Sequence, residues 1–464
     1  MKLKLFLPIV VLAALLAACD KTVEPASDTQ TKQWVYDQMK SWYYWNDQIT
    51  AQPDYTKDIK SLFESLLYKY DATLRPQGDR FSVIRESADE LVASLNGESK
   101  TTGMEYKLNY YPSGTTNVIG VVFYVLPGSP AAKAGFARGD IFSSVNGQRL
   151  TGSNYSQLLN TEDKRTYTLA KISKDGALEE GTVIREVTPI VFQEDPVYFD
   201  TLFTYGDKRI GYVVYHQFIP GPNSNADSKQ YDKKLDEIFG SFKEKNVNAL
   251  IVDLRYNPGG YVSSATNLAS LIAKATSNDV FYYKEYNPQI TEINRKKYGE
   301  TFFYDKFLSK SQNIGSSLND LVLLTSSRSA SASELLINGL KPFMKVTLVG
   351  DKTYGKNVGS ITISGADKGI KWGMQPIVSK SLNSLRQSDY YTGFKPDVEV
   401  KEGITLYPYG NPKDPLLGEA LFQITGMHLA RQAATTRTVQ ENAGEELKST
   451  IEKKAGGSNM FHDK

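Results

Sequence analysis

A run of serines in the second half of the chain could support nucleophilic chemistry. Residues 326–334 read Ser-Ser-Arg-Ser-Ala-Ser-Ala-Ser-Glu and lie between an apolar segment typical of a buried strand and a segment whose pattern predicts a helix. Ser331 and Glu334 have the spacing of a helix-capping box, which is a structural role. A serine at a helix N-terminus can also attack a substrate, because the helix dipole and free N–H groups there favour developing negative charge. This segment alone leaves both roles open.

A lysine follows 25 residues later, in a segment that resembles a phosphate-binding loop. Residues 350–357 read Gly-Asp-Lys-Thr-Tyr-Gly-Lys-Asn, but Asn357 stands where that loop needs a hydroxyl for Mg²⁺. Residues 358–363 predict a strand, whereas the loop must open a helix, so we reject nucleotide binding. A desolvated Lys356 could act as a general base. A loop lysine considered by itself is more often a solvated charge.

Two glycines end a third candidate segment. Residues 253–260 read Asp-Leu-Arg-Tyr-Asn-Pro-Gly-Gly and follow a run typical of a buried strand. Gly259 and Gly260 would let backbone N–H groups approach a substrate closely, and such groups can stabilise an oxyanion. A tight turn from strand to helix would need the same glycines, so this segment alone favours the structural reading.

The histidines offer a second hydrolase chemistry, a Ser-His-Asp triad. His216 lies in a strand-like run, where a histidine is more often structural, and His428 and His462 lie near or in a polar tail. Three histidines in the whole chain argue against a His-rich metal site, and a single cysteine excludes an internal disulfide.

The elements that would position these residues alternate between strands and helices. Residues 210–215, 248–254, 321–325 and 346–349 predict buried strands, and residues 332–343 predict a helix. This alternation over residues 191–425 indicates a largely parallel sheet with helices outside it. Residues 31–95 are helical in pattern and rich in aromatic residues, which predicts a small helical domain. The fold class expected is therefore a multidomain α/β protein.

Residues 96–190 have a β-rich pattern, unlike the helical segment before them, and contain a recognisable sequence motif. Ser129-Pro130 can open a short helix, and Asn146-Gly147 is a hairpin signal. The run Pro-Gly-Ser-Pro-Ala-Ala-Lys-Ala-Gly, followed by Gly-Asp-Ile-Phe-Ser-Ser-Val-Asn-Gly, closely resembles a PDZ domain. The resemblance implies that a peptide's C-terminal end adds as a strand to the sheet edge, with Gly103 and Met104 in the loop that receives its carboxylate. A PDZ domain that only packs inside the protein is the alternative.

The three segments, in this order behind a PDZ-like block, closely resemble the C-terminal processing peptidases, also called tail-specific proteases, over about residues 80–400. The resemblance implies a crotonase-like αββ core, no metal or organic cofactor, and protein or peptide substrates bound through their C-terminal ends. It implies Ser331 as nucleophile, Lys356 as general base, and amides of Gly259 or Gly260 and of Ala332 as oxyanion donors. Many members carry a glutamine four residues after the lysine, where this chain has Ser360, which is the candidate for orienting Lys356.

The N-terminal residues predict where in the cell the protein is located. Residues 1–18 combine two lysines with an unbroken apolar run, and they end in Leu-Ala-Ala before Cys19, which resembles a bacterial lipobox. The resemblance implies cleavage before Cys19, a lipid on its sulfur, and a location in the bacterial cell envelope at a membrane surface. An ordinary signal peptide is the alternative. We interpret residues 19–30 as a tether, and the polar residues 426–464 as a poorly ordered tail.

The charge balance limits the kinds of partner. The chain has 54 basic and 52 acidic residues, and loss of Lys2 and Lys4 with the signal peptide would leave a net charge of zero. This argues against a broad electrostatic nucleic-acid binder.

The sequence thus predicts an envelope serine endopeptidase with a Ser-Lys dyad. A catalytically silent lipoprotein that binds peptide ends through its PDZ domain is the alternative favoured by Ser360. An envelope assembly factor is a third.

Overall fold

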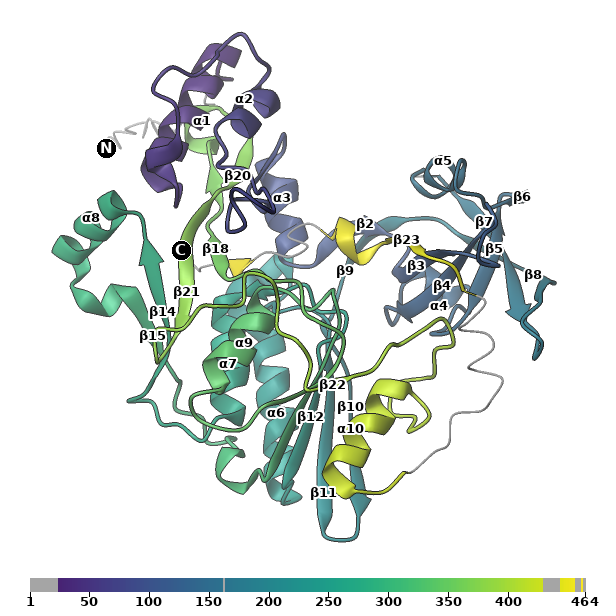
Figure 1. Ribbon diagram of the computed structural model, residues 1–464. Coiled ribbons are helices and arrows are strands. Elements are labelled where there is room, and N and C mark those ends of the chain that lie inside the picture. The colour runs from purple at the N-terminus through teal and green to yellow at the C-terminus, as the bar shows by residue number, and fades with distance from the viewer. Residues whose placement is uncertain (1–23, 162, 429–442, 455–459, 462–464) are drawn as a thin grey trace, which may run out of the picture.

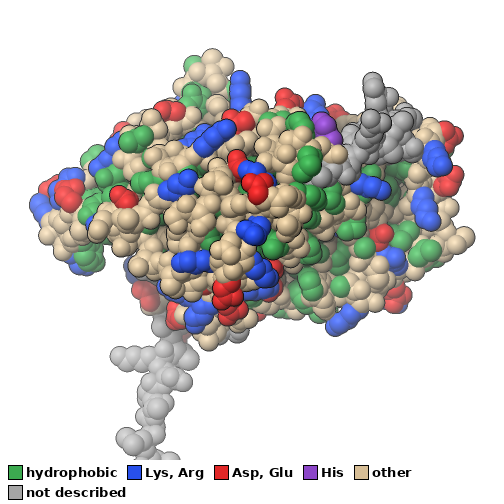
Figure 2. All heavy atoms as spheres, turned by 90° about the horizontal axis from the view of Figure 1, so that it is seen from below, with side chains coloured by type: hydrophobic (Ala, Val, Ile, Leu, Met, Phe, Trp, Pro, Cys, Tyr) green, Lys and Arg blue, Asp and Glu red, His purple; other side chains and the backbone are tan. Residues whose placement is uncertain are grey.

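The computed structural model describes residues 24–161, 163–428, 443–454 and 460–461, which form a helical N-terminal part, a PDZ-like sheet and an α/β core (Figure 1). Cys19 and the predicted signal peptide lie outside the described residues. Among the described residues, no helix is both long and apolar enough to cross a bilayer. Acidic and basic side chains are interspersed over the face shown in Figure 2, as the balanced charge predicts.

The N-terminal part shares its hydrophobic cluster with the α/β core. It contains the helices α1 (Asp28–Trp42), α2 (Ile59–Ser65) and α3 (Ala88–Leu95) and the strand β1 (Val83–Arg85). Helix α1 starts inside the predicted tether, because Ser27 caps it by accepting a hydrogen bond from the Gln30 N–H. Met39 and Tyr43 are fully buried and belong to one cluster with Met374 and Ile377 from far along the chain. The aromatic stripe is therefore core, as predicted, but not the core of an independent domain.

The PDZ region confirms two local predictions from the sequence, a helix start at Ser129-Pro130 and a hairpin at Asn146-Gly147. Ser129 caps α4 (Pro130–Lys133) with Pro130 in its first turn, and Asn146-Gly147 turns between β5 and β6 with both residues at positive φ. Its strands and second helix are β3 (Met104–Tyr110), β4 (Val118–Val125), β5 (Ile141–Val145), β6 (Gln148–Arg149), β7 (Arg165–Ile172), β8 (Leu178–Val187) and α5 (Tyr155–Leu159). The strands β2 (Glu98–Thr101) and β9 (Ile190–Gln193) pair where the chain enters and leaves this region.

The α/β core is built on a six-stranded sheet that is parallel except at one edge. The strand order is β10 (Val197–Tyr205), β11 (Lys208–Tyr215), β12 (Ala249–Asp253), β16 (Asp320–Thr325), β17 (Thr347–Gly350) and β22 (Val398–Glu399), with β10 antiparallel to β11. Alternate residues face opposite sides of the sheet: Val252 and Leu323 pack with α6 (Gln230–Glu244), α7 (Val262–Ile272) and α9 (Ala332–Leu340). Ile251 and Val322 pack with α10 (Pro415–Thr425) on the opposite side (Figure 1).

A second sheet lies beside these helices. Its order is β13 (Gly260–Tyr261), β24 (Met460–Phe461), β18 (Val358–Ser360), β21 (Ile377–Asn383), β14 (Val280–Tyr286) and β15 (Tyr304–Lys306). The remaining helix and strands are α8 (Pro288–Tyr298), β19 (Ile363–Ser364) and β20 (Gly373–Gln375), of which β20 pairs with β1 and β19.

Part of the C-terminal tail forms ordered structure, which corrects the prediction for residues 443–454. Strand β23 (Glu446–Ser449) pairs with β3 of the PDZ sheet, and Ile451 is 2% exposed. The polar composition of this segment concealed a strand, because a strand at a sheet edge needs backbone partners more than apolar side chains.

Candidate active site

The three segments singled out in the sequence meet at one edge of the six-stranded sheet. Residues 254–260 follow β12, residues 326–331 follow β16, and residues 351–357 follow β17. These three strands are parallel neighbours in register, so their carboxyl ends lie side by side. The carbonyl of Asn257 joins the first two segments by accepting hydrogen bonds from the Ala330 N–H (3.2 Å) and the Ser333 hydroxyl (3.0 Å).

Ser331 immediately precedes helix α9 and is completely buried. Its backbone has φ 62° and ψ −110°, a conformation that costs a residue with a Cβ about 1–3 kcal/mol. Of the two hydrogen bonds of a capping box, the one from the Ser331 N–H to the Glu334 carboxylate is present, whereas the Ser331 hydroxyl has no hydrogen-bond partner among the described residues. A buried hydroxyl without a hydrogen-bond partner, on a strained backbone at a helix start, can act as a nucleophile.

Gly259 lies directly against Ser331. Its φ is 111°, and a Cβ at this position would be 2.7 Å from the Ser331 Cβ and 3.0 Å from the Ala332 nitrogen. The Gly259 N–H itself donates to the Asn257 Oδ1 (2.9 Å). The Ala332 N–H, at the start of α9, has no acceptor among the described residues and is available to an oxyanion. Gly260, with φ 136°, is the first residue of β13 and pairs with β24.

Lys356 is completely buried in the segment between β17 and β18. Burial lowers the pKa of its amine well below the usual range, an effect that Asp79 and Glu334 oppose and Arg80 reinforces. The amine lies 4.7 Å from the centre of the Phe81 ring. The loop lysine is therefore desolvated, which is the condition under which an amine becomes a general base near neutral pH.

Glu334 is the residue whose role the sequence analysis missed. Its buried carboxylate accepts four hydrogen bonds: Oε2 from the N–H groups of Ser331 (2.9 Å) and Lys356 (2.7 Å), and Oε1 from the Gly355 N–H (2.7 Å) and the Thr353 hydroxyl (2.6 Å). Burial raises its pKa, and these hydrogen bonds oppose the rise. One oxygen thus binds the backbones of both candidate catalytic residues. The capping-box spacing was its only signal in the sequence.

Asp79, Arg80 and Phe81 extend the site from the N-terminal part, which the sequence did not predict. The Arg80 guanidinium donates to the carbonyl oxygens of Gly355 (3.0 Å) and Tyr391 (3.1 Å). Asp79 is buried and accepts from the Tyr43 hydroxyl (2.8 Å). The helical part therefore braces the segment that carries Lys356.

Ser360 and His216, two further candidate site residues, are both buried but have different neighbours. Ser360 is completely buried on β18, opposite Ile377 of β21. His216 is buried in an aromatic cluster: it stacks on Tyr124 with ring centres 3.8 Å apart, and its Nε2 lies 3.1 Å from the Tyr409 hydroxyl. Burial lowers the pKa of His216 well below its usual range, and nearby cations add to this. The Ser331 hydroxyl has no hydrogen-bond partner in the described part of the chain, so His216 does not pair with it and the structural interpretation of this histidine is the better one.

Of the other candidate residues, His428, Gly103 and Met104 lie within the described part of the chain, and His462 does not. His428 stacks on Phe422, and His462 is not among the described residues. The N–H of Gly103 donates to the Thr101 hydroxyl (3.0 Å) and that of Met104 to the Thr102 hydroxyl (3.4 Å), so both amides expected to receive a carboxylate have acceptors here. In the described part of the chain, no group of His, Cys, Asp and Glu could hold a metal ion.

Comparison with known proteins identifies the modules. Residues 209–400 match peptidase family S41, residues 30–83 match the peptidase S41 N-terminal domain, and residues 121–170 match a PDZ domain. The carboxyl-terminal-processing protease of Picosynechococcus sp. is 24% identical, over 78% of this chain and 78% of its own length. The carboxy-terminal processing protease CtpB of Bacillus subtilis is also 24% identical, over 68% of this chain and 58% of its own length. A crystal structure of a Bacteroides fragilis protein assigned to the S41 proteases superimposes with a TM-score of 0.69 at 26% identity, over 85% of this chain and 97% of that one.

Proposed function

We propose, from the premise that the chain belongs to peptidase family S41 and is a serine peptidase, that Ser331 and Lys356 are its catalytic dyad. The single observation that carries this assignment is the Glu334 carboxylate, whose Oε2 accepts from the backbone amides of both residues. The backbones of the proposed nucleophile and base are thus neighbours, although 25 residues separate them in the sequence. The desolvated state of Lys356 and the unpaired hydroxyl of Ser331 support the same roles.

The proposed reaction needs only groups of this chain and water. Neutral Lys356 takes the proton from the Ser331 hydroxyl while the oxygen attacks the peptide carbonyl carbon. The carbonyl oxygen becomes an oxyanion that accepts a hydrogen bond from the Ala332 N–H, with a second donor from the turn at residues 259–260. The C–N bond then breaks as protonated Lys356 gives its proton to the leaving amine. Water attacks the ester, Lys356 takes the proton of that water, and Ser331 recovers its hydrogen as the acid is released.

The PDZ domain supplies the proposed substrate class. A PDZ sheet edge binds an extended peptide through backbone hydrogen bonds, so a protein with an unfolded C-terminal end is the substrate that this combination of domains fits. The names of the relatives, which are carboxyl-terminal-processing proteases, support the same class. We propose C-terminal ends of proteins as the segments bound.

The dyad is tested with separate substitutions and a matched control. The variants Ser331→Ala and Lys356→Ala should each reduce the cleavage rate of an unfolded protein by at least about 10³-fold. Lys352→Ala removes an exposed lysine of the same segment and should leave the rate unchanged. A fluorophosphonate probe should label Ser331 in the wild-type chain. Wild-type cleavage by either dyad variant refutes the assignment.

We also propose that Cys19 carries a lipid that holds the protein at a membrane surface of the bacterial cell envelope. The lipobox-like residues before this single cysteine support the proposal. Metabolic labelling with an alkyne fatty acid should mark the wild-type chain and not Cys19→Ser. Equal labelling of the two chains contradicts the proposal.

A further inference from the structure

A segment near the C-terminus occupies the edge of the PDZ sheet. Strand β23 runs antiparallel to β3, which without β23 would be the outermost strand of the sheet. Backbone hydrogen bonds continue beyond the strand: the Gly444 N–H donates to the Tyr110 carbonyl (2.9 Å), and the Thr450 N–H donates to the Tyr106 carbonyl (3.0 Å). Such a strand added to an exposed sheet edge is the way in which a peptide ligand binds.

The side chains of this segment fit the groove between β3 and α5. Leu447 packs against the hydrophobic core of the PDZ sheet. The Thr450 hydroxyl accepts from the Tyr106 N–H (2.9 Å), and it lies beside the same residues of β3 that form the groove. Residues 448–450 and the helix α5 line one hollow together, so the segment lies between the strand and the helix.

Charged contacts connect the segment to the loop that carries Ser331. The guanidinium of Arg328, three residues before Ser331, forms an ion pair with Glu446, and its Nε lies 3.3 Å from the Ser449 hydroxyl. The Lys454 amine forms an ion pair with Glu194 (2.6 Å). The segment therefore contacts the PDZ sheet, the nucleophile loop and the connection between them.

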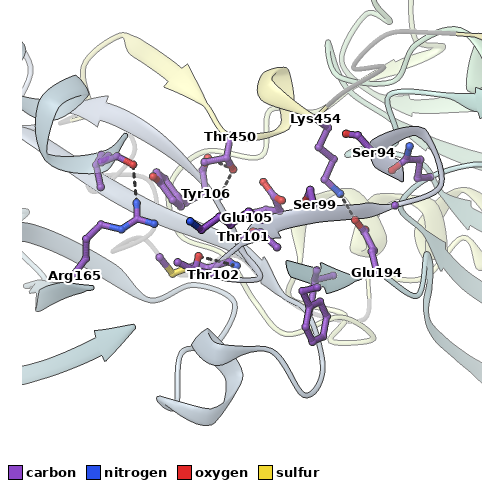
Figure 3. A pocket seen from close by; sticks show the side chains of 17 residues that line it. Ser94, Ser99, Thr101, Thr102, Glu105, Tyr106, Arg165, Glu194, Thr450 and Lys454 are labelled. Atoms are coloured by element: carbon purple, nitrogen blue, oxygen red, sulfur yellow. Dashed lines mark hydrogen bonds and ion pairs between the residues drawn. The ribbon is translucent and has the colours of Figure 1, made fainter. Parts of the chain in front are cut away.

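Thr450 and Lys454 also close one side of a pocket of about 230 Å³ beside β3. Figure 3 shows Thr450 next to Tyr106 and Lys454 in contact with Glu194 at this pocket, which Glu105 also lines. The backbone of β24, further along the same terminal segment, lies between β13 and β18, opposite Gly260 and Ser360. The terminal segment thus lies along both the PDZ edge and the strands next to the candidate active site.

We propose that residues 443–454 are an internal ligand of the PDZ groove, which a substrate segment must displace in order to bind β3. This inference rests on the proposed function, in which the groove binds substrate. The contacts of the internal ligand also indicate which peptides compete with it. They are extended segments with a carboxylate placed to reach Arg328, an aliphatic side chain next to it, and a hydroxyl four residues after the carboxylate.

Two substitutions should release the internal ligand in the full chain. Glu446→Lys places a like charge at Arg328, and Thr450→Pro removes the N–H that donates to Tyr106 and the hydroxyl that accepts from it. The control, Glu445→Lys, makes the same charge change on an exposed side chain one residue earlier. All chains carry Ser331→Ala, so that binding is measured without cleavage.

Binding is measured by fluorescence anisotropy with a labelled synthetic peptide of residues 443–454. Each of the two variants, Glu446→Lys and Thr450→Pro, should bind this peptide at least about 10-fold more tightly than the parent chain. The reason is that apparent affinity scales with the fraction of molecules whose groove is open. The Glu445→Lys control should bind like the parent. If both variants bind the peptide with the same affinity as the parent chain, the proposal is overturned.

Hydrogen exchange on the parent chain gives a second test that needs no folding-sensitive variant. Saturating peptide should speed exchange of the chain's own amides at residues 446–450. If the peptide binds while these amides stay protected, the groove is not its site and the proposal is refuted. Neither readout involves cleavage, so failure of the catalytic dyad in the activity assay is distinguishable from failure of this inference.

Discussion

The buried amine of Lys356 makes a quantitative prediction about folding. Lys356→Met replaces the amine by an uncharged side chain of similar length that still contacts the Phe81 ring, since thioethers pack well on aromatic rings. The folded wild-type protein holds a lysine whose pKa is well below its usual range because of burial. The unfolded chain protonates the same lysine with a pKa of about 10.4. The two states therefore bind different numbers of protons over an alkaline range of pH.

The size of the effect follows from this difference of one proton. Between the depressed folded pKa and about 10.4, the free energy of unfolding of the wild type should rise by about 1.4 kcal/mol per pH unit from this residue. Methionine removes that contribution. The stability advantage of Lys356→Met over the wild type should therefore shrink as the pH rises through this range, by about 1.4 kcal/mol for each pH unit.

Urea unfolding of both chains at pH 8, 8.5, 9 and 9.5 measures this slope. Lys352→Met is the matched control, because it removes an exposed lysine of the same segment, and its difference from the wild type should not change with pH. If the difference in free energy of unfolding between Lys356→Met and the wild type does not change with pH, the folded protein keeps this lysine charged. The general-base role would then be lost, because a charged amine has no lone pair to accept the serine proton.

Three further substitutions test the geometry around Ser331. Ser331→Gly relieves the φ of 62° and should raise the free energy of unfolding by about 1 kcal/mol while abolishing cleavage; unchanged stability in urea would contradict the strain. Gly259→Ala places a Cβ 2.7 Å from that of Ser331 and should lower kcat/KM at least about 100-fold; near-normal kinetics would show that this contact is not needed. Glu334→Gln leaves at least one backbone N–H without its carboxylate acceptor and should destabilise the fold by about 2–4 kcal/mol in thermal or urea unfolding; a loss below about 0.5 kcal/mol would refute the role of this carboxylate.

Much of the local structure was predictable, because it depends on residues close together in the sequence. The apolar runs at 248–254 and 321–325 correspond to the buried strands β12 and β16, and the serine run ends at the start of α9. Pro130 and Asn146-Gly147 set a helix start and a hairpin through their own backbone preferences. The family resemblance is confirmed, because residues 209–400 match peptidase family S41 and residues 30–83 match the peptidase S41 N-terminal domain.

The chemistry of the site was not predictable from the same residues. A lysine is a base or a solvated cation depending on what surrounds it, and the groups that surround Lys356 include Asp79 and Phe81 from nearly 280 residues earlier. Glu334 looked like half of a helix cap, yet it binds residues 353–356 of a neighbouring segment. Both results depend on packing between distant segments, which a single sequence does not encode in any local pattern.

The sequence by itself determined the order of the modules, the buried strands and the residue types available for catalysis. Only the tertiary structure decided that the carboxyl ends of β12, β16 and β17 meet at one edge, that Lys356 is shielded from water, and that a polar C-terminal segment lies on the PDZ sheet. The physical reason is that hydrophobic periodicity and turn preferences act over a few residues. Desolvation and strand pairing are properties of neighbours in space, and these are set only when the whole chain has folded.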